Sequence, residues 1–120
     1  MSFQLQTEQM PGYLAARFIG PGVPEEIWRQ FALIAEYCKH TKNNKVLIDF
    51  TRAEVKVSLL DRFLMGESAR IFAIHRIKVA GVDNPERIDP QKFAKLVAQN
   101  RGVIVEAFSD LQAAEEWLLN

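Results

Sequence analysis

The sequence is short of cysteine, of net charge and of long apolar runs, and each shortage excludes a class of protein. Cys38 is the single cysteine among 120 residues, so no internal disulfide forms and we expect a reducing, cytoplasmic compartment. Fifteen basic residues balance fifteen acidic ones, which argues against a nucleic-acid binder that neutralises phosphates. No apolar stretch approaches the roughly 18 residues of a membrane-spanning helix. We therefore predict no nucleic-acid partner and no transmembrane segment.

Motifs of catalysis, metal binding and cofactor binding are also missing. The Gly20-Pro21-Gly22 turn lacks both the lysine of a phosphate-binding loop and the third glycine of a dinucleotide site. The two histidines and one cysteine have no metal-ligand spacing, so we expect no metal and no cofactor. We predict no catalytic residue and a protein that is not an enzyme. One enzymatic alternative stays open, and it needs Asp49, Ser58 and His75 to converge in one pocket.

Turn residues and apolar periodicity divide the chain into alternating strands and helices of one domain, residues 1–120. Strands are predicted over residues 3–7, 13–19, 45–50, 77–82 and 103–108, and helices over 24–41, from 58 through 71, from 89 to about 100, and after 109. This β-β-α-β-α-β-α-β-α order is typical of an α/β fold. It predicts a mostly parallel sheet of four to five strands with an antiparallel edge strand and right-handed crossovers.

Helix boundaries carry recognisable capping residues. Ser58 with Asp61 three residues later forms a capping-box pattern at the start of the second helix, and Ser109 with Gln112 repeats it at the last helix. Asp89-Pro90 predicts an N-cap followed by a first-turn proline. Gly102 predicts a left-handed residue after the third helix.

The two faces of the predicted sheet differ in polarity. Alternate positions of the four strands after the first form two sets, and one set is wholly apolar. The other set carries a charge on each of these strands: Arg17 on the first, Lys45 and Asp49 on the next, then Lys78, and Glu106 on the last. We expect helices to pack on the first face and to cover the second only in part. A half-open second face is a candidate surface for self-association or for an apolar ligand. Two alternatives stay open: that helix ends and loops cover this face, and that Asp49 pairs there with Arg17 or Lys78.

Ser58 has two readings that the sequence does not separate. Its position at a helix start makes it a cap. The free N–H groups and dipole of a helix start also favour phosphate, so phosphorylation of Ser58 would add up to two negative charges and switch a partner on or off.

Several stretches resemble the STAS domain family, in particular its SpoIIAA-like branch of anti-sigma factor antagonists. The resemblance rests on residues 45–51, 59–63, 88–93, 100–102 and 108–118, and it covers nearly the whole chain. It implies a non-enzymatic module of bacterial regulation. Family members carry a phosphorylatable serine in an Asp-Ser-Ser-Gly motif that opens the second helix. Here the matching stretch is Lys56-Val57-Ser58-Leu59, which keeps one serine and lacks the acid, the second serine and the glycine.

The leading hypothesis is therefore a regulatory module that binds a protein partner or forms a homodimer, with Ser58 as the candidate phosphorylation site. The alternative is an apolar small-molecule or lipid-binding protein, peripheral to membranes, because the fold is also similar to that of lipid-carrying CRAL-TRIO domains. For either hypothesis, the predicted ligand or partner surface comprises Tyr13, Arg17, Leu47, Asp49, Thr51, Leu59, Phe63, Lys78 and Phe108.

Overall fold

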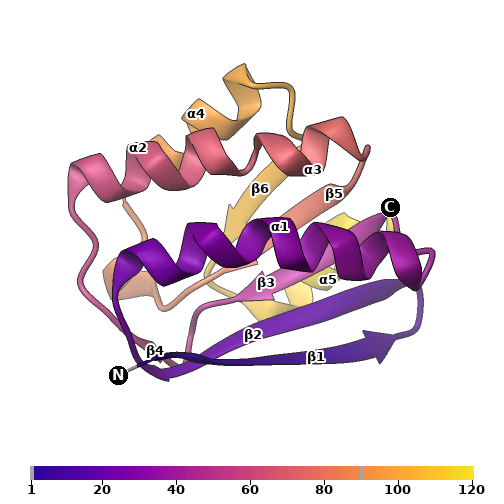
Figure 1. Ribbon diagram of the computed structural model, residues 1–120, viewed down its shortest axis with the longest axis horizontal. Coiled ribbons are helices and arrows are strands. Elements are labelled where there is room, and N and C mark those ends of the chain that lie inside the picture. The colour runs from indigo at the N-terminus through magenta and orange to yellow at the C-terminus, as the bar shows by residue number, and fades with distance from the viewer. Residues whose placement is uncertain (1, 90) are drawn as a thin grey trace.

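The computed structural model describes residues 2–89 and 91–120 and has the predicted α/β architecture (Figure 1). The strands are β1 (Gln4–Met10), β2 (Tyr13–Pro21), β3 (Lys45–Asp49), β4 (Ala53–Glu54), β5 (Lys78–Val82) and β6 (Val105–Phe108). The helices are α1 (Pro24–His40), α2 (Leu59–Ser68), α3 (Arg70–Ile74), α4 (Phe93–Asn100) and α5 (Leu111–Leu119), with a 3-10 helix η1 (Pro85–Arg87). Among these residues, no helix combines the length and apolar character that crossing a membrane requires.

The sheet confirms the predicted topology and adds one short strand. Its order is β1-β2-β3-β5-β6, with β1 antiparallel to β2 and the remaining pairs parallel. The addition is β4, which pairs with the end of β2 through Gly20↔Ala53 and Pro21↔Glu54. Two residues are too few for a period-2 pattern to reveal a strand. The β3–α2 connection is therefore tied to the sheet at the end where β3 finishes.

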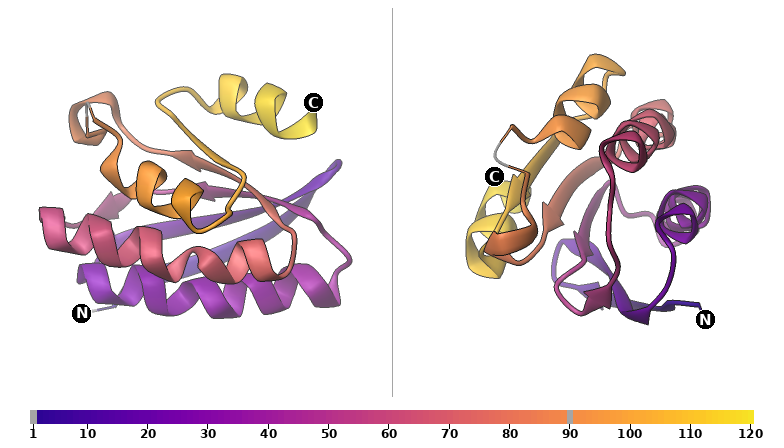
Figure 2. Two further views of the ribbon diagram at one scale, coloured as in Figure 1. Left: turned by 90° about the horizontal axis from the view of Figure 1, so that it is seen from above. Right: turned by 90° about the vertical axis from the view of Figure 1, so that its left-hand side faces the viewer.

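The apolar face of the sheet lies under α1, α2, α3 and α4 (Figure 2). Its strand residues Leu14, Phe18, Val46 and Ile48 are buried, as the alternation predicted. The ring of Phe18 stacks on Phe50 with centroids 5.6 Å apart. This face holds the larger of the two apolar cores.

The second face is covered by α5, so the expectation that it is half open is wrong at its centre. Tyr13 and Leu47 are only 3% and 2% exposed, and both pack in a core with Ala114 and Leu118 of α5. The cover is the body of a helix, whereas the alternative left open by the sequence was a cover of helix ends and loops. Small residues make the close approach of α5 feasible, since Ala80 beneath it is fully buried.

Two predicted helices have different boundaries in the structure. The helix expected from 58 through 71 is two helices, because α2 ends at Ser68 and α3 begins at Arg70. The third helix begins at Phe93 after Lys92 in the left-handed region (φ 50). Asp89 instead accepts the N–H groups of Gln91 and Phe93 in the preceding turn.

The caps predicted for the last two helices, α4 and α5, can be compared with the structure one by one. The predicted first-turn Pro90 lies outside the described residues. Asp110 rather than Ser109 caps α5, since its carboxylate accepts the N–H groups of Gln112 and Ala113. Gly102 has φ 88 after α4, which confirms the predicted left-handed residue there.

Candidate functional site

The start of α2 is fixed by the capping box that the sequence predicted. Ser58 Oγ accepts the Asp61 N–H at 3.1 Å, and the Asp61 carboxylate accepts the Ser58 N–H at 2.8 Å. Two N–H groups that a helix leaves without partners are thereby satisfied. Ser58 is exposed, so its side chain is open to solvent while it caps the helix.

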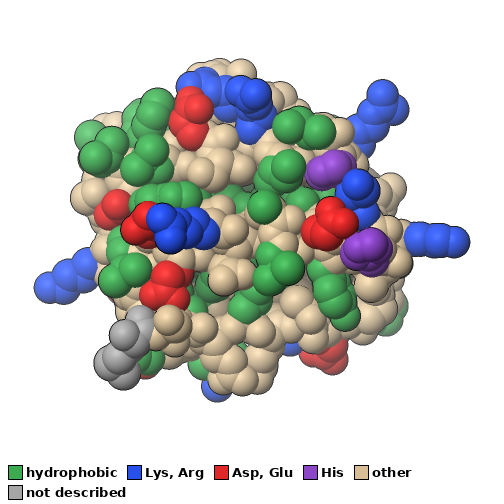
Figure 3. All heavy atoms as spheres, viewed as in Figure 1, with side chains coloured by type: hydrophobic (Ala, Val, Ile, Leu, Met, Phe, Trp, Pro, Cys, Tyr) green, Lys and Arg blue, Asp and Glu red, His purple; other side chains and the backbone are tan. Residues whose placement is uncertain are grey.

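Three apolar side chains in the first turns of α2 face solvent. Leu59 and Leu60 are each 66% exposed and Phe63 is 36% exposed; we call these three residues the α2 patch. Leu59 and Phe63 belong to the ligand or partner surface predicted from the sequence, whereas Leu60 does not. Figure 3 shows hydrophobic side chains gathered where α2 begins.

The later half of α2 is held by α4 instead. A Cβ atom on Gly66 would lie 2.6 Å from Val97 Cβ and 2.7 Å from the Ala94 carbonyl oxygen. Glycine is therefore required for the two helices to approach this closely. Arg101 and Glu67 add an ion pair between the end of α4 and α2. The α2 patch thus projects from a helix whose other end is rigidly packed.

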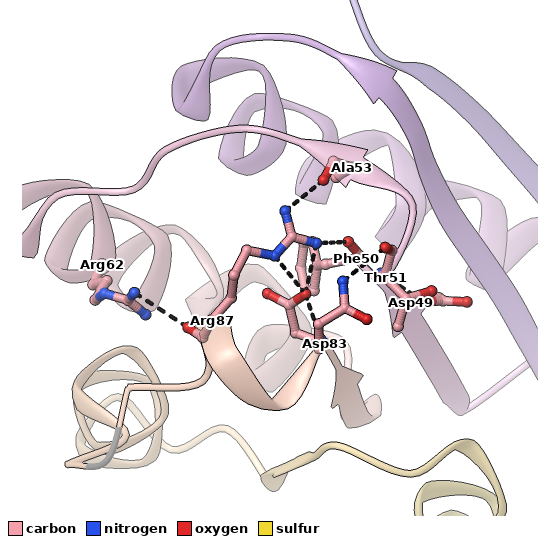
Figure 4. Close-up of polar contacts among 8 residues, drawn as sticks. Asp49, Phe50, Thr51, Ala53, Arg62, Asp83 and Arg87 are labelled. Atoms are coloured by element: carbon pink, nitrogen blue, oxygen red, sulfur yellow. Dashed lines mark hydrogen bonds and ion pairs between the residues drawn. The ribbon is translucent and has the colours of Figure 1, made fainter.

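Next to the patch, one arginine ties together the chain segments that leave β3 and β5 (Figure 4). The Arg87 guanidinium donates to the carbonyl oxygens of Phe50 and Ala53 and contacts the Asp83 carboxylate at 2.8 Å. Burial raises the pKa of Asp83, while an N–H from Asn84 and the charge of Arg87 oppose the rise. A planar fork of donors suits this geometry. The arginine thereby fixes the loop between β3 and α2.

Asp49 and Thr51 form a turn at the end of β3 rather than a sheet-face ion pair. The Asp49 carboxylate accepts the Thr51 N–H at 2.8 Å and its hydroxyl at 2.7 Å. Neither predicted pairing of Asp49 is present. Arg17 contacts Glu8 at 3.0 Å, and Lys78 donates to the Trp117 carbonyl oxygen at 2.8 Å. Arg17 and Asp49 are partners in the β2–β3 register, so strand parity places two charges side by side without fixing which groups they bind.

The predicted ligand surface is consequently divided among four places. Leu59 and Phe63 lie in the α2 patch, and Asp49 and Thr51 lie in the turn after β3. Of the remaining residues, Arg17 contacts Glu8 of β1, whereas Tyr13, Leu47, Lys78 and Phe108 lie beneath or beside α5. Tyr13 is buried there and donates its hydroxyl proton to Glu115 at 2.6 Å. Burial and the Glu115 carboxylate raise the Tyr13 pKa to about 12. Lys78 Nζ lies 4.4 Å from the centroid of the Trp117 ring.

The enzymatic triad does not assemble. Lys45 pairs with Lys78 and Asp49 with Val82 in parallel strands, so Asp49 lies where β3 and β5 end. His75 precedes β5 and therefore lies where these strands begin. Asp49 and His75 are therefore at opposite ends of the sheet. The enzymatic alternative, which needs both residues and Ser58 in one pocket, is wrong.

A cavity of about 570 Å³ lies beside the start of α2, at the end of the sheet where the parallel strands finish. Phe108 is the one residue of the predicted surface that lines it, although open α/β sheets commonly bind ligands at this end. Its lining includes Phe50, Arg62, Asp83, Arg87 and Phe93. A signal was present in Gly81, a glycine inside a strand, which often marks a close approach to a ligand or a second backbone. Within the described residues, no group of three or more His, Cys, Asp or Glu side chains is placed to hold a metal ion.

Comparison with known proteins finds similar folds without close sequence relatives. No family model matches the sequence, and a search of curated proteins finds no match. An anti-sigma factor antagonist from Mycobacterium paratuberculosis superposes with a TM-score of 0.65 at 9% identity, over 99% of this chain and 96% of that one. An uncharacterized protein with a SpoIIAA-like fold from Shewanella loihica gives 0.57 at 20% identity, over 97% and 93%.

A third solved structure extends the comparison to a regulator. The Bacillus cell fate determinant SpoIIAA in its phosphorylated form gives a TM-score of 0.54 at 12% identity, over 97% of this chain and 99% of that one. Similarity at these identities concerns the fold. The described chain therefore has the SpoIIAA-like fold that its sequence resemblance implied.

Proposed function

We propose that this protein is a non-enzymatic regulatory module that binds a partner protein through the α2 patch. The observation that carries the proposal is the exposure of Leu59, Leu60 and Phe63 on a helix that is capped at one end and packed at the other. Apolar clusters on a rigid surface are favourable for association, because binding removes them from water without ordering a flexible segment. The similar folds of two named regulators are consistent with this role by analogy.

The proposed contact surface is narrower than the one predicted from the sequence. It keeps Leu59 and Phe63 and adds Leu60. Buried Tyr13 and Leu47 are left out, and so are Arg17 and Lys78, whose charged groups already have partners within the protein. The unpaired Cys38 supports a cytoplasmic setting for this interaction.

Site-directed photocrosslinking tests the proposal. A photoreactive residue at position 60, expressed in the native cell, is expected to give a discrete adduct with a different protein. A Leu59→Asp substitution in the same chain should abolish the adduct, since a charge in a buried apolar contact is strongly unfavourable. Position 104 is the matched control, because Ile104 is equally exposed but lies outside the patch. No adduct at position 60, or an adduct only with a second copy of this chain, would overturn the proposal.

We further propose that phosphorylation of Ser58 controls this contact. The serine is exposed and adjoins Leu59. A phosphate there would stand beside the Asp61 carboxylate, which already occupies the Ser58 N–H, so like-charge repulsion would disturb the capping box and the patch. Incubation with extract of the native cell and ATP, followed by mass spectrometry, is expected to find phosphate on Ser58 and none in Ser58→Ala. Repeated absence of phosphate from Ser58 would exclude the switch while leaving the α2 patch proposal intact.

A further inference from the structure

The cavity at the carboxyl end of the strands is a separate feature from the α2 patch. It has the size of a small-molecule site, since such sites span roughly 300–1,000 Å³ and this one measures about 570 Å³. It lies between α2, η1 and α4 and the ends of β5 and β6, and Leu59, Leu60 and Phe63 are not among its lining residues. Its apolar walls include Ile27, Phe50, Met65, Val82 and Phe93.

A smaller apolar hollow adjoins the cavity. This hollow of about 140 Å³ lies between the helices and the apolar face, against Phe31, Phe72 and Val79. The two spaces share lining residues, namely Phe50, Met65, Gly81, Ala94, Lys95 and Ala107. The larger cavity, which we call the outer chamber, therefore adjoins a smaller apolar hollow along the sheet, which we call the inner chamber.

Gly81 stands at the junction of the two spaces, and neither backbone conformation nor packing requires a glycine there. Its φ is not among the positive values of the chain. A Cβ atom would meet nothing closer than the Glu106 carbonyl oxygen at 4.0 Å. A glycine weakens a strand interior and often marks the close approach of a ligand. The missing side chain keeps the passage between the chambers open.

The outer chamber has positive charges that the protein does not neutralise by contact. Of the cations that line it, Arg87 is held by Asp83, and Lys92 and Lys95 by Glu106. Arg62 is half-buried, donates to the Arg87 carbonyl oxygen at 3.4 Å (Figure 4), and like Lys56 has no ion pair within 4.0 Å among the described residues.

In the described part of the chain, the carboxylates that line the chamber form no ion pair with half-buried Arg62 or exposed Lys56, although the charge of Arg62 acts to lower the pKa of both Asp83 and Asp89. Asp83 is paired with Arg87, and Asp89 accepts two backbone N–H groups, which together with the charge of Arg62 lower the Asp89 pKa. Glu86 is exposed. A half-buried arginine without a contacting carboxylate is suited to a bidentate anionic group.

We propose that this cavity binds an organic anion with a slender aliphatic tail. Its carboxylate or phosphate head contacts Arg62 and Lys56, and its tail passes Gly81 into the inner apolar chamber. This binding site is independent of the proposed protein contact, because it uses different side chains of α2.

Isothermal titration calorimetry of the purified protein tests the proposal with decanoate, decyl phosphate, decanol and butyrate, each below its micelle concentration. We expect at least one of the two long-chain anions to bind, and the tighter one identifies the head group. Decanol should bind at least about tenfold more weakly, because it cannot form the charge-assisted contact. Butyrate should not bind measurably, because its tail is too short to bury apolar area in the inner chamber.

Two variants test separately how the charged head and the aliphatic tail of the ligand contribute to binding. Arg62→Gln should weaken binding of the long-chain anion about tenfold and leave decanol unchanged. Arg70→Gln is the matched control, since Arg70 is exposed on α3 and does not line the cavity. Gly81→Val should abolish binding of both ligands while the protein stays folded, as judged by its circular dichroism, because valine suits a strand and fills the passage. Absence of binding by both anions, equal affinity for the tighter anion and decanol, or unchanged affinity in either cavity variant would overturn the proposal.

Discussion

One face of the sheet carries α1, α2, α3 and α4, whereas the other carries α5 alone. The crowded face is apolar along every strand, yet it contains the cavity and the inner chamber. The face with charges on its strands is closed by one nine-residue helix. The face with wholly apolar strand positions is therefore not the face that its helices cover more tightly.

The difference arises from how each face uses its polar and small residues. Under α5, the small side chains of Ala15, Ala80 and Ala114 allow close packing. Tyr13 and Lys78 reach the rim and bond to α5. On the other face, Gly66 brings α2 against α4, while Gly81 leaves space below them. Charged residues on a strand can thus anchor a covering helix instead of marking an open surface.

The largest expected effect on stability comes from a substitution in the core between α5 and the sheet. Leu118→Ala removes a fully buried side chain beneath α5 and should lower the free energy of unfolding by about 3 kcal/mol, from lost burial and the cavity left behind. Chemical denaturation measures this change. The matched Leu119→Ala, at an exposed position of the same helix, should cost about 0.5 kcal/mol or less. Equal effects of the two substitutions would mean that α5 does not seal the sheet.

Removal of the arginine that joins β3, β5 and η1 tests the crowded face at its cavity end. Arg87→Ala leaves the Asp83 carboxylate and the Phe50 and Ala53 carbonyl oxygens without their donor, and should cost about 2 kcal/mol of stability. Arg87→Lys keeps the charge without the planar fork, so it should recover less than half of the loss. Full recovery by lysine in urea unfolding would contradict the role of the fork.

The tight contact between α2 and α4 gives a prediction in which propensity and packing oppose each other. Alanine is favoured over glycine inside a helix by about 1 kcal/mol. At Gly66 the added Cβ would overlap Val97 and the Ala94 carbonyl, so Gly66→Ala should still destabilise the protein, by about 1 kcal/mol net. A higher melting temperature for the variant, measured by circular dichroism, would refute close packing at this crossing.

The smallest expected effect on stability at neutral pH comes from removing the hydrogen bond between Tyr13 and Glu115 of α5. Tyr13→Phe loses the hydrogen bond to Glu115 and should cost about 1 kcal/mol or less. The Tyr13 pKa is about 12 in the folded protein, whereas an unperturbed tyrosine side chain has a pKa of 10.0. The unfolded chain therefore loses this proton first, and stability from Tyr13 falls as pH rises from 10 to 12. Comparison of the two proteins across that range by denaturation should find a shallower decline in Tyr13→Phe; identical declines would place Tyr13 outside a buried contact.

Cap and strand signals were readable where they act over a few neighbouring residues. The Ser58–Asp61 box was predicted because its two hydrogen bonds join positions three apart. The apolar face was predicted because side chains alternate along a strand. Leu59 and Phe63 of the α2 patch were predicted as surface residues, but Leu60 was missed, since helical periodicity ranks the faces of a helix without saying how far a covering element extends. At this end of α2, α4 does not reach over Leu59 and Leu60.

The sequence by itself determined the order of elements, the parallel sheet with its antiparallel edge, and the cap that starts α2. Those features follow from local backbone preference and from periodicity. The tertiary structure decided that α5 closes the charged face, that Arg87 joins the segments after β3 and β5, and that Gly81 opens a cavity. Each of these depends on distances between elements far apart in the chain, which no local pattern specifies.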